Sequence, residues 1–284
     1  MSRPGKRGHR LGLDMERRER RHCGLCGKLE LLSRTHVPPQ SAGNTGQVTR
    51  GATEIRQGIR RQERQRVGGL WVRGLCRACN TLAGSDCDPA YADFAQRMLA
   101  YQRTSAVLGI PGRNVPALNV APALVARSVL FGMFAINTNL REIAPELAIA
   151  LLENHPSATL PAGIRLRVAR ISGRRARVTG AYWAQRVLTR PQRYWVFGEI
   201  SFPPFAWALA VDEPGMIFDE DGWADASDWS TLPPTPSTVD LRSLVSTFPP
   251  VRHPLLGEHD EWIEMLSDQI CPIVEATLPA DFGY

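Results

Sequence analysis

Apolar positions recur at two different spacings in the second half of the chain. Residues 124–134 and 143–152 carry them at helical spacing, and both segments are predicted to be helices with one apolar face. Four other apolar runs are predicted to be strands: 164–171, 176–183, 194–202 and 205–211. The Ser-Gly-Arg-Arg sequence at 172–175 predicts that the first two strands form a hairpin. The acidic, proline-bearing residues 212–238 are expected to be a long loop, and 261–271 a helix.

The first hundred residues show shorter apolar runs, which glycine, proline and charged residues separate. Residues 29–36 and 70–75 are predicted to be short strands, and Pro38-Pro39 forces an extended exit from the first of them. A helix is expected to begin near residues 77–80. Pro89 is placed to start a second helix that continues through residue 99.

These elements predict an α+β protein of three parts. Residues 1–22 would be a basic tail, residues 23–110 a small module with an arginine-rich insertion at 40–69, and residues 120–284 an α+β domain of unassigned fold. The glycines and prolines of residues 109–122 indicate the linker between the last two parts. No run approaches the ~18 apolar residues of a membrane span, and no apolar stretch follows the basic N-terminus. We therefore expect a cytoplasmic protein with no membrane association.

Charge is distributed unevenly along the chain. Residues 1–114 carry 21 basic and 9 acidic residues, a net charge of +12, whereas the remaining residues carry a net charge of −6. This asymmetry is typical of a module that faces nucleic acid joined to a part that does not. The acidic balance of the C-terminal part favours recognition of a protein partner or self-association over DNA binding.

Four of the six cysteines form two C-x-x-C pairs, Cys23/Cys26 and Cys76/Cys79. Each pair presents two thiolates about one turn apart, and the two pairs together complete a tetrahedral four-sulfur shell. Such a shell has no open position, so the pattern predicts one structural zinc ion. Cys87 and Cys271 are left over and are interpreted as ordinary thiols.

The order of these parts carries a resemblance to a known family. His36-Val37-Pro38 lies between the cysteine pairs, and Asn80 directly follows the second pair. The order of cysteine pair, strand with histidine, strand, cysteine pair with asparagine, and helix resembles the zinc-stabilised HNH endonucleases, over about residues 20–100. The resemblance implies a ββα-metal fold that hydrolyses DNA phosphodiester bonds. It also implies that His36 is the general base and that Asn80 is a ligand of a catalytic Mg²⁺ or Mn²⁺ ion.

One position departs from the family pattern. Many HNH enzymes have an acidic metal ligand directly before the histidine, where this chain has Thr35. A threonine hydroxyl leaves the site one negative charge short. Asp86 and Asp88 are the nearest carboxylates that could substitute, and Asp88 is preferred. The alternative is an inactive zinc module that binds nucleic acid or a protein partner.

The insertion supplies the candidate contacts to DNA. Its arginines could share part of a helical surface and bind the phosphate backbone without reading sequence. They are Arg56, Arg60, Arg61, Arg64 and Arg66. The alternative is a solvated loop in a protein-interaction factor. Restriction or anti-phage defence is a plausible setting for a nuclease of this kind.

Overall fold

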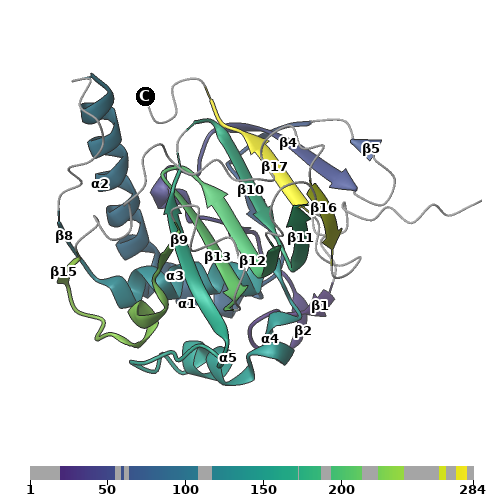
Figure 1. Cartoon of the computed structure of the whole chain (residues 1–284). Helices are drawn as coiled ribbons and strands as arrows, with labels where there is room; N and C mark the ends of the chain where they lie inside the picture. Colours follow the sequence, from purple (N-terminus) through teal and green to yellow (C-terminus); the bar gives the residue numbers. More distant parts are fainter. Residues whose placement is uncertain are drawn as a thin grey trace, which may run out of the picture.

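The computed structural model describes most of the chain, in the ranges 20–54, 59–60, 64–107, 117–171, 173–186, 193–212, 223–239, 262–266 and 273–279 (Figure 1). Its helices and sheets confirm the predicted mixed α+β class. Among the helices in these ranges, none combines the length and the apolarity needed to cross a bilayer.

The centre of the described structure is an eleven-stranded sheet in which every recorded pairing is antiparallel. Its main strand order is β14-β9-β13-β12-β10-β17-β4-β5, with β6 beside β4 and with β11 between β12 and β16. The strands are β4 (Gln47–Glu54), β5 (Ile59–Arg60), β6 (Arg64–Val67), β9 (Ile164–Arg170), β10 (Arg175–Thr179), β11 (Tyr182–Arg186), β12 (Arg193–Phe202), β13 (Phe205–Val211), β14 (Ala224–Asp225), β16 (Trp262–Leu266) and β17 (Ile273–Thr277).

Three two-stranded sheets lie outside this sheet. They are β1 (Arg20–His22) with β2 (Leu29–Leu31), β3 (Thr35–His36) with β7 (Trp71–Val72), and β8 (Leu118–Val120) with β15 (Ser237–Val239). The helices are α1 (Arg77–Asp86), α2 (Asp88–Val107), α3 (Pro122–Ile136), α4 (Leu140–Ile143) and α5 (Pro145–Leu152), with 3-10 turns η2 (Gln40–Ala42) and η5 (Ser227–Thr231).

Helix α3 lies across one face of the sheet and forms the middle of the core (Figure 1). Every residue of α3 except Leu124 is buried, so burial extends beyond the one apolar face that the sequence predicts and includes Arg127 and Ser128. A Cβ atom at Gly132 would come within 2.9 Å of the Ile200 side chain of β12, so the absent side chain lets helix and sheet approach closely.

An aromatic cluster connects α2 to the same core. Phe94 stacks on Phe205 with 4.4 Å between ring centroids, and it meets Trp229 of η5 edge-on at 5.8 Å. The ring centroids of Tyr91 and Trp207 lie 6.4 Å apart. Residues from both sides of the predicted linker therefore share one apolar core, although residues 108–116 of that linker lie outside the described ranges.

The structure corrects two predicted elements. Residues 164–171 and 176–183 do not form a hairpin, because β9 pairs with β13 while β10 pairs with β12 and β17. The β12–β13 hairpin lies between β9 and β10 in the sheet. The helix predicted at 261–271 is also wrong over Trp262–Leu266, which pairs with β11 as strand β16.

Candidate functional site

The four paired cysteines converge where the β1–β2 turn meets the start of α1. Their sulfur atoms all lie within 4.8 Å of one another, and the Sγ atoms of Cys26 and Cys76 are 3.8 Å apart. Four thiolates bound to one zinc ion at about 2.3 Å stand about 3.8 Å from each other. The cluster of Cys23, Cys26, Cys76 and Cys79 could therefore hold a zinc ion, as the sequence predicts.

Hydrogen bonds to Cys23 Sγ favour negative charge on that sulfur. The Cys76 amide donates a hydrogen bond to Cys23 Sγ at 3.3 Å. The pKa of Cys23 is lowered to about 4, first because the Cys79 thiol donates to its sulfur, although burial opposes the change. Burial raises the pKa of Cys26, and the hydrogen bond to Cys23 together with burial raises the pKa of Cys79. Burial also raises the pKa of Cys87, to about 12. Cys87 lies outside the cluster, and Cys271 lies outside the described residues.

His36 occupies the end of β3, opposite Trp71 of β7. Its Nε2 atom lies 2.8 Å from the Gly68 carbonyl oxygen, which can only accept a hydrogen bond. The ring proton is therefore assigned to Nε2, and Nδ1 carries the basic lone pair of the neutral ring. Burial lowers the pKa of His36, while the bond to Gly68 opposes that shift.

A buried amide fixes the two segments that flank His36. Asn44 donates from Nδ2 to the carbonyl oxygens of Pro38 and Leu70, at 2.6 and 2.7 Å, and its Oδ1 atom accepts from the Leu70 amide at 2.6 Å. Gly69 has a φ of 77°, and a Cβ atom there would lie 2.1 Å from the Asn44 carbonyl oxygen. Asn44 and this glycine therefore hold the chain beside His36 in one arrangement.

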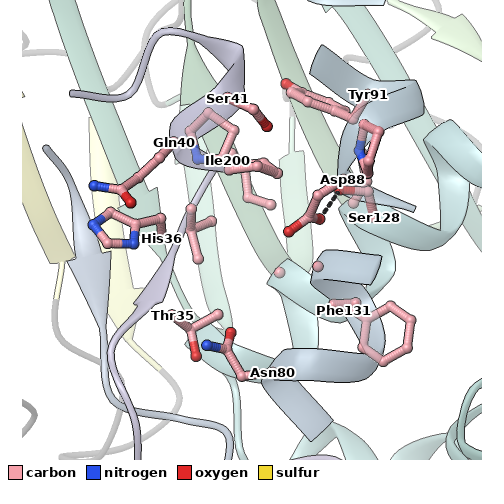
Figure 2. Close-up of a pocket in the computed structure, with 18 of the residues that line it drawn as sticks. Thr35, His36, Gln40, Ser41, Asn80, Asp88, Tyr91, Ser128, Phe131 and Ile200 are labelled. Atoms are coloured by element: carbon pink, nitrogen blue, oxygen red, sulfur yellow. Dashed lines mark hydrogen bonds between the residues drawn. The ribbon is translucent and has the colours of Figure 1, made fainter. Parts of the chain in front are cut away.

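A pocket of about 350 Å³ brings together the candidate residues of the resemblance. Thr35, His36, Asn80 and Asp88 all line it, although they come from β3, α1 and the start of α2 (Figure 2). The lining also includes residues of α3 and β12, among them Ser128. The pocket is therefore formed jointly by residues of the predicted module 23–110 and by residues beyond the predicted linker.

Two uncharged side chains, Asn80 and Thr35, contribute oxygen atoms to the pocket. Asn80 Nδ2 donates to the Arg34 carbonyl oxygen at 3.1 Å, so its Oδ1 atom is the end of the amide that remains for a ligand. Thr35 is 5% exposed, and its hydroxyl has no hydrogen-bond partner among the described residues. Buried hydroxyls without partners are uncommon, so this one marks a place where a polar ligand would be stabilising.

Asp88 supplies a carboxylate to the same pocket. Its Oδ1 atom accepts a 2.8 Å hydrogen bond from the Ser128 hydroxyl, and its Oδ2 atom lies on the side of Gly84. Burial raises the pKa of Asp88, and the Ser128 bond partly opposes this. Asp86, the other carboxylate considered, is exposed, contacts Asn154 at 3.4 Å and is not among the lining residues of the pocket.

The arginines predicted to bind DNA cannot be placed against this pocket. Arg56 and Arg61 lie outside the described residues. Arg60, Arg64 and Arg66 belong to the backbone of β5 and β6, and their side chains lie outside the description. The backbone around them is extended, in contrast to the helical surface that the sequence suggests.

Sequence reasoning missed three residues of the site. Ser128 lies in an apolar helix more than 40 residues from the motif, and Asn44 lies in a segment rich in polar residues. Gly84 looks like a helix interruption but lines the pocket inside α1. Only the spacing of Gly84, four residues after Asn80, was a usable signal, because residues at this spacing share a helix face.

Scans of the sequence against protein-family models and curated proteins, and a search of solved structures, found no match.

Proposed function

We propose that the chain is a metal-dependent endonuclease of the HNH type that hydrolyses DNA phosphodiester bonds. The observation that carries the proposal is one pocket lined both by His36, whose basic nitrogen is assigned, and by the oxygen donors Thr35, Asn80 and Asp88. A general base and a hard-cation site side by side are what hydrolysis of a phosphodiester requires.

His36 would act as the base through Nδ1. Its Nε2–H group is already engaged by Gly68, which fixes both the tautomer and the ring plane. Because burial lowers the pKa of His36, the ring is neutral at pH 7 and able to take a proton from the attacking water.

Asn80 Oδ1 and Asp88 Oδ2 would bind the divalent cation, with the Thr35 hydroxyl as a third, neutral oxygen. Oxygen donors suit Mg²⁺ and Mn²⁺, and the Asp88 carboxylate restores the negative charge that Thr35 does not supply. Gly84 favours this arrangement, because its missing side chain keeps the space beside Asp88 Oδ2 open. A divalent cation bound there would stabilise negative charge on the phosphate and on the leaving oxygen.

The zinc ion would have a positioning role. Cys76 is the N-cap of α1, Cys79 lies in the first turn of this helix, and Asn80 directly follows Cys79. A closed four-sulfur shell would hold this turn against the Cys23–Cys26 loop and so fix Asn80 relative to the strand that carries His36.

Positive charge beside His36 would attract the DNA backbone. The Arg34 and Arg73 guanidinium carbons lie 4.7 and 5.6 Å from the centre of the Trp71 ring, and Trp71 pairs with His36 across β3 and β7. Stacked guanidinium groups are well suited to phosphate contact. We extend the same role to the arginines of residues 56–66, and we expect binding that weakens steeply with salt.

Nicking of supercoiled plasmid DNA tests the proposal. Zinc-loaded protein with Mg²⁺ or Mn²⁺ should convert the plasmid to open circles, and His36→Ala should slow this by about 10²-fold or more. His155→Ala is a matched control, because the exposed His155 ring bonds within its own loop, to the Ser157 carbonyl oxygen. Equal nicking by wild type and His36→Ala would refute the proposal.

The competing function is a zinc module that binds nucleic acid without cutting it, and Thr35 is the observation in its favour. Salt-dependent DNA binding by wild type and His36→Ala alike, with no metal-dependent nicking by either protein, would select this alternative.

A further inference from the structure

Ser128 and its neighbour Arg127 are the two polar residues of the buried helix α3. Ser128 carries the inference. Ser128 is 4% exposed, and its hydroxyl donates to Asp88 Oδ1 at 2.8 Å, as the dashed line in Figure 2 shows. A serine inside a helix commonly bonds the carbonyl oxygen one turn earlier in its own helix. The Ser128 hydroxyl instead reaches another helix and a carboxylate that lines the pocket.

The bond limits how Asp88 can orient its two oxygens. The terminal torsion of an aspartate is broad and nearly two-fold, so an unrestrained carboxylate rotates easily. Ser128 lies on a helix buried almost completely between the sheet and the other helices, so its hydroxyl is a fixed point. With Oδ1 held there, Oδ2 faces the Gly84 side of the pocket, and no described residue donates a hydrogen bond to it.

We propose that Ser128 is a positioning residue that holds the Asp88 carboxylate so that Oδ2 is presented to a divalent cation together with Asn80. The inference rests on the proposed function for the existence of the cation site. Ligand carboxylates in metal sites are themselves oriented by hydrogen bonds from surrounding groups. The HNH-like segment does not supply this donor, so the α3 helix beyond the predicted linker completes the site.

A purely structural alternative makes a different prediction. In that case Asp88 would serve only to satisfy the buried Ser128 hydroxyl, and removal of the hydroxyl would change stability without changing cation affinity. The two roles therefore separate in a binding measurement that involves no DNA.

The test is Mn²⁺ binding to the zinc-loaded full-length protein, followed by the electron paramagnetic resonance signal of free Mn²⁺. We expect Ser128→Ala to weaken binding by about tenfold or more, and Asp88→Asn to weaken it at least as much. The double variant should bind no more weakly than Asp88→Asn alone, because Ser128 acts through Asp88. Ser85→Ala, on the exposed surface of α1, is the matched serine control and should bind like wild type.

Three results would overturn the inference: an unchanged Mn²⁺ affinity in Ser128→Ala, additive losses in the double variant, or no Mn²⁺ binding by wild type at millimolar concentration. Thermal unfolding without Mn²⁺ checks that each variant is folded. Plasmid nicking distinguishes failure of the positioning role of Ser128 from failure of the proposed nuclease function. Nicking that depends on His36 but with unchanged Mn²⁺ affinity in Ser128→Ala removes only the positioning role. The expected Mn²⁺ pattern without nicking removes only the nuclease.

Discussion

Gly84 offers a substitution whose effects on stability and on activity should have opposite signs. It lies in α1 four residues after Asn80, on the wall of the pocket. An alanine Cβ at this position would contact only Asp88 Oδ2, at 3.8 Å, which is an ordinary van der Waals separation. Gly84→Ala is therefore accommodated by the fold, and its methyl group enters the space beside Asp88 Oδ2, one of the proposed cation ligands.

The expected magnitudes follow from this geometry. Alanine is favoured over glycine inside a helix by up to about 1 kcal/mol, so the variant should unfold at a temperature about 2–4 °C higher than wild type. The methyl group would occupy space that the cation and its waters need beside Asp88. Nicking at a fixed, subsaturating metal concentration should therefore fall by about tenfold or more, with a metal-activation midpoint at higher concentration.

Thermal unfolding without Mg²⁺ or Mn²⁺ and plasmid nicking over a metal titration measure both effects on the same preparations. Ser85→Ala, the next residue of α1, is exposed and does not line the pocket, so it should nick at the wild-type rate. A Gly84→Ala protein that nicks with the wild-type rate and the wild-type metal midpoint would refute the placement of the cation beside Asp88 Oδ2.

Three other predictions address the scaffold and the base. Asn44→Ala removes three buried hydrogen bonds and should lower the free energy of unfolding by about 2–4 kcal/mol in urea titrations, whereas a loss below about 0.5 kcal/mol would show that these bonds contribute little. Burial lowers the pKa of His36 below 6.5, so the single-turnover nicking rate at saturating metal should stay constant down to pH 6.5 and fall only at lower pH. A nicking rate that has already fallen to half at a pH above 6.5 would contradict this assignment of the base. Metal analysis should find one zinc ion per chain. Cys79→Ser should lose the zinc ion and unfold at a lower temperature than wild type, whereas Cys87→Ala should retain the zinc ion. Equal zinc contents in the two variants would contradict the four-cysteine site.

The helices and the cysteine cluster were predictable because local signals determine them. The apolar faces of residues 89–99 and 124–134 require burial, and Pro89 and Pro122 each stand in the first turn of a helix in the structure. A four-sulfur shell needs only two pairs of neighbouring thiols, so the spacing of the cysteines suffices to predict it.

Strand pairing was not predictable in the same way. The turn sequence after β9 favours a chain reversal, but the partner of β9 is chosen by burial across the whole sheet, and β13 competes successfully with β10. Residues 262–266 similarly become a strand because β11 presents an edge to them. Ser128 and Asn44 matter through contacts with distant residues, and no periodicity or spacing in the sequence records such contacts.

The role of His36 as a general base can be measured most directly by chemical rescue. His36→Gly leaves an imidazole-sized space at the end of β3, beside the Gly68 carbonyl oxygen that normally accepts from the ring. We expect His36→Gly to nick plasmid DNA about 10²-fold more slowly than wild type, and added imidazole to restore nicking in proportion to its neutral form. Unimpaired nicking by His36→Gly without imidazole would show that His36 is not the general base.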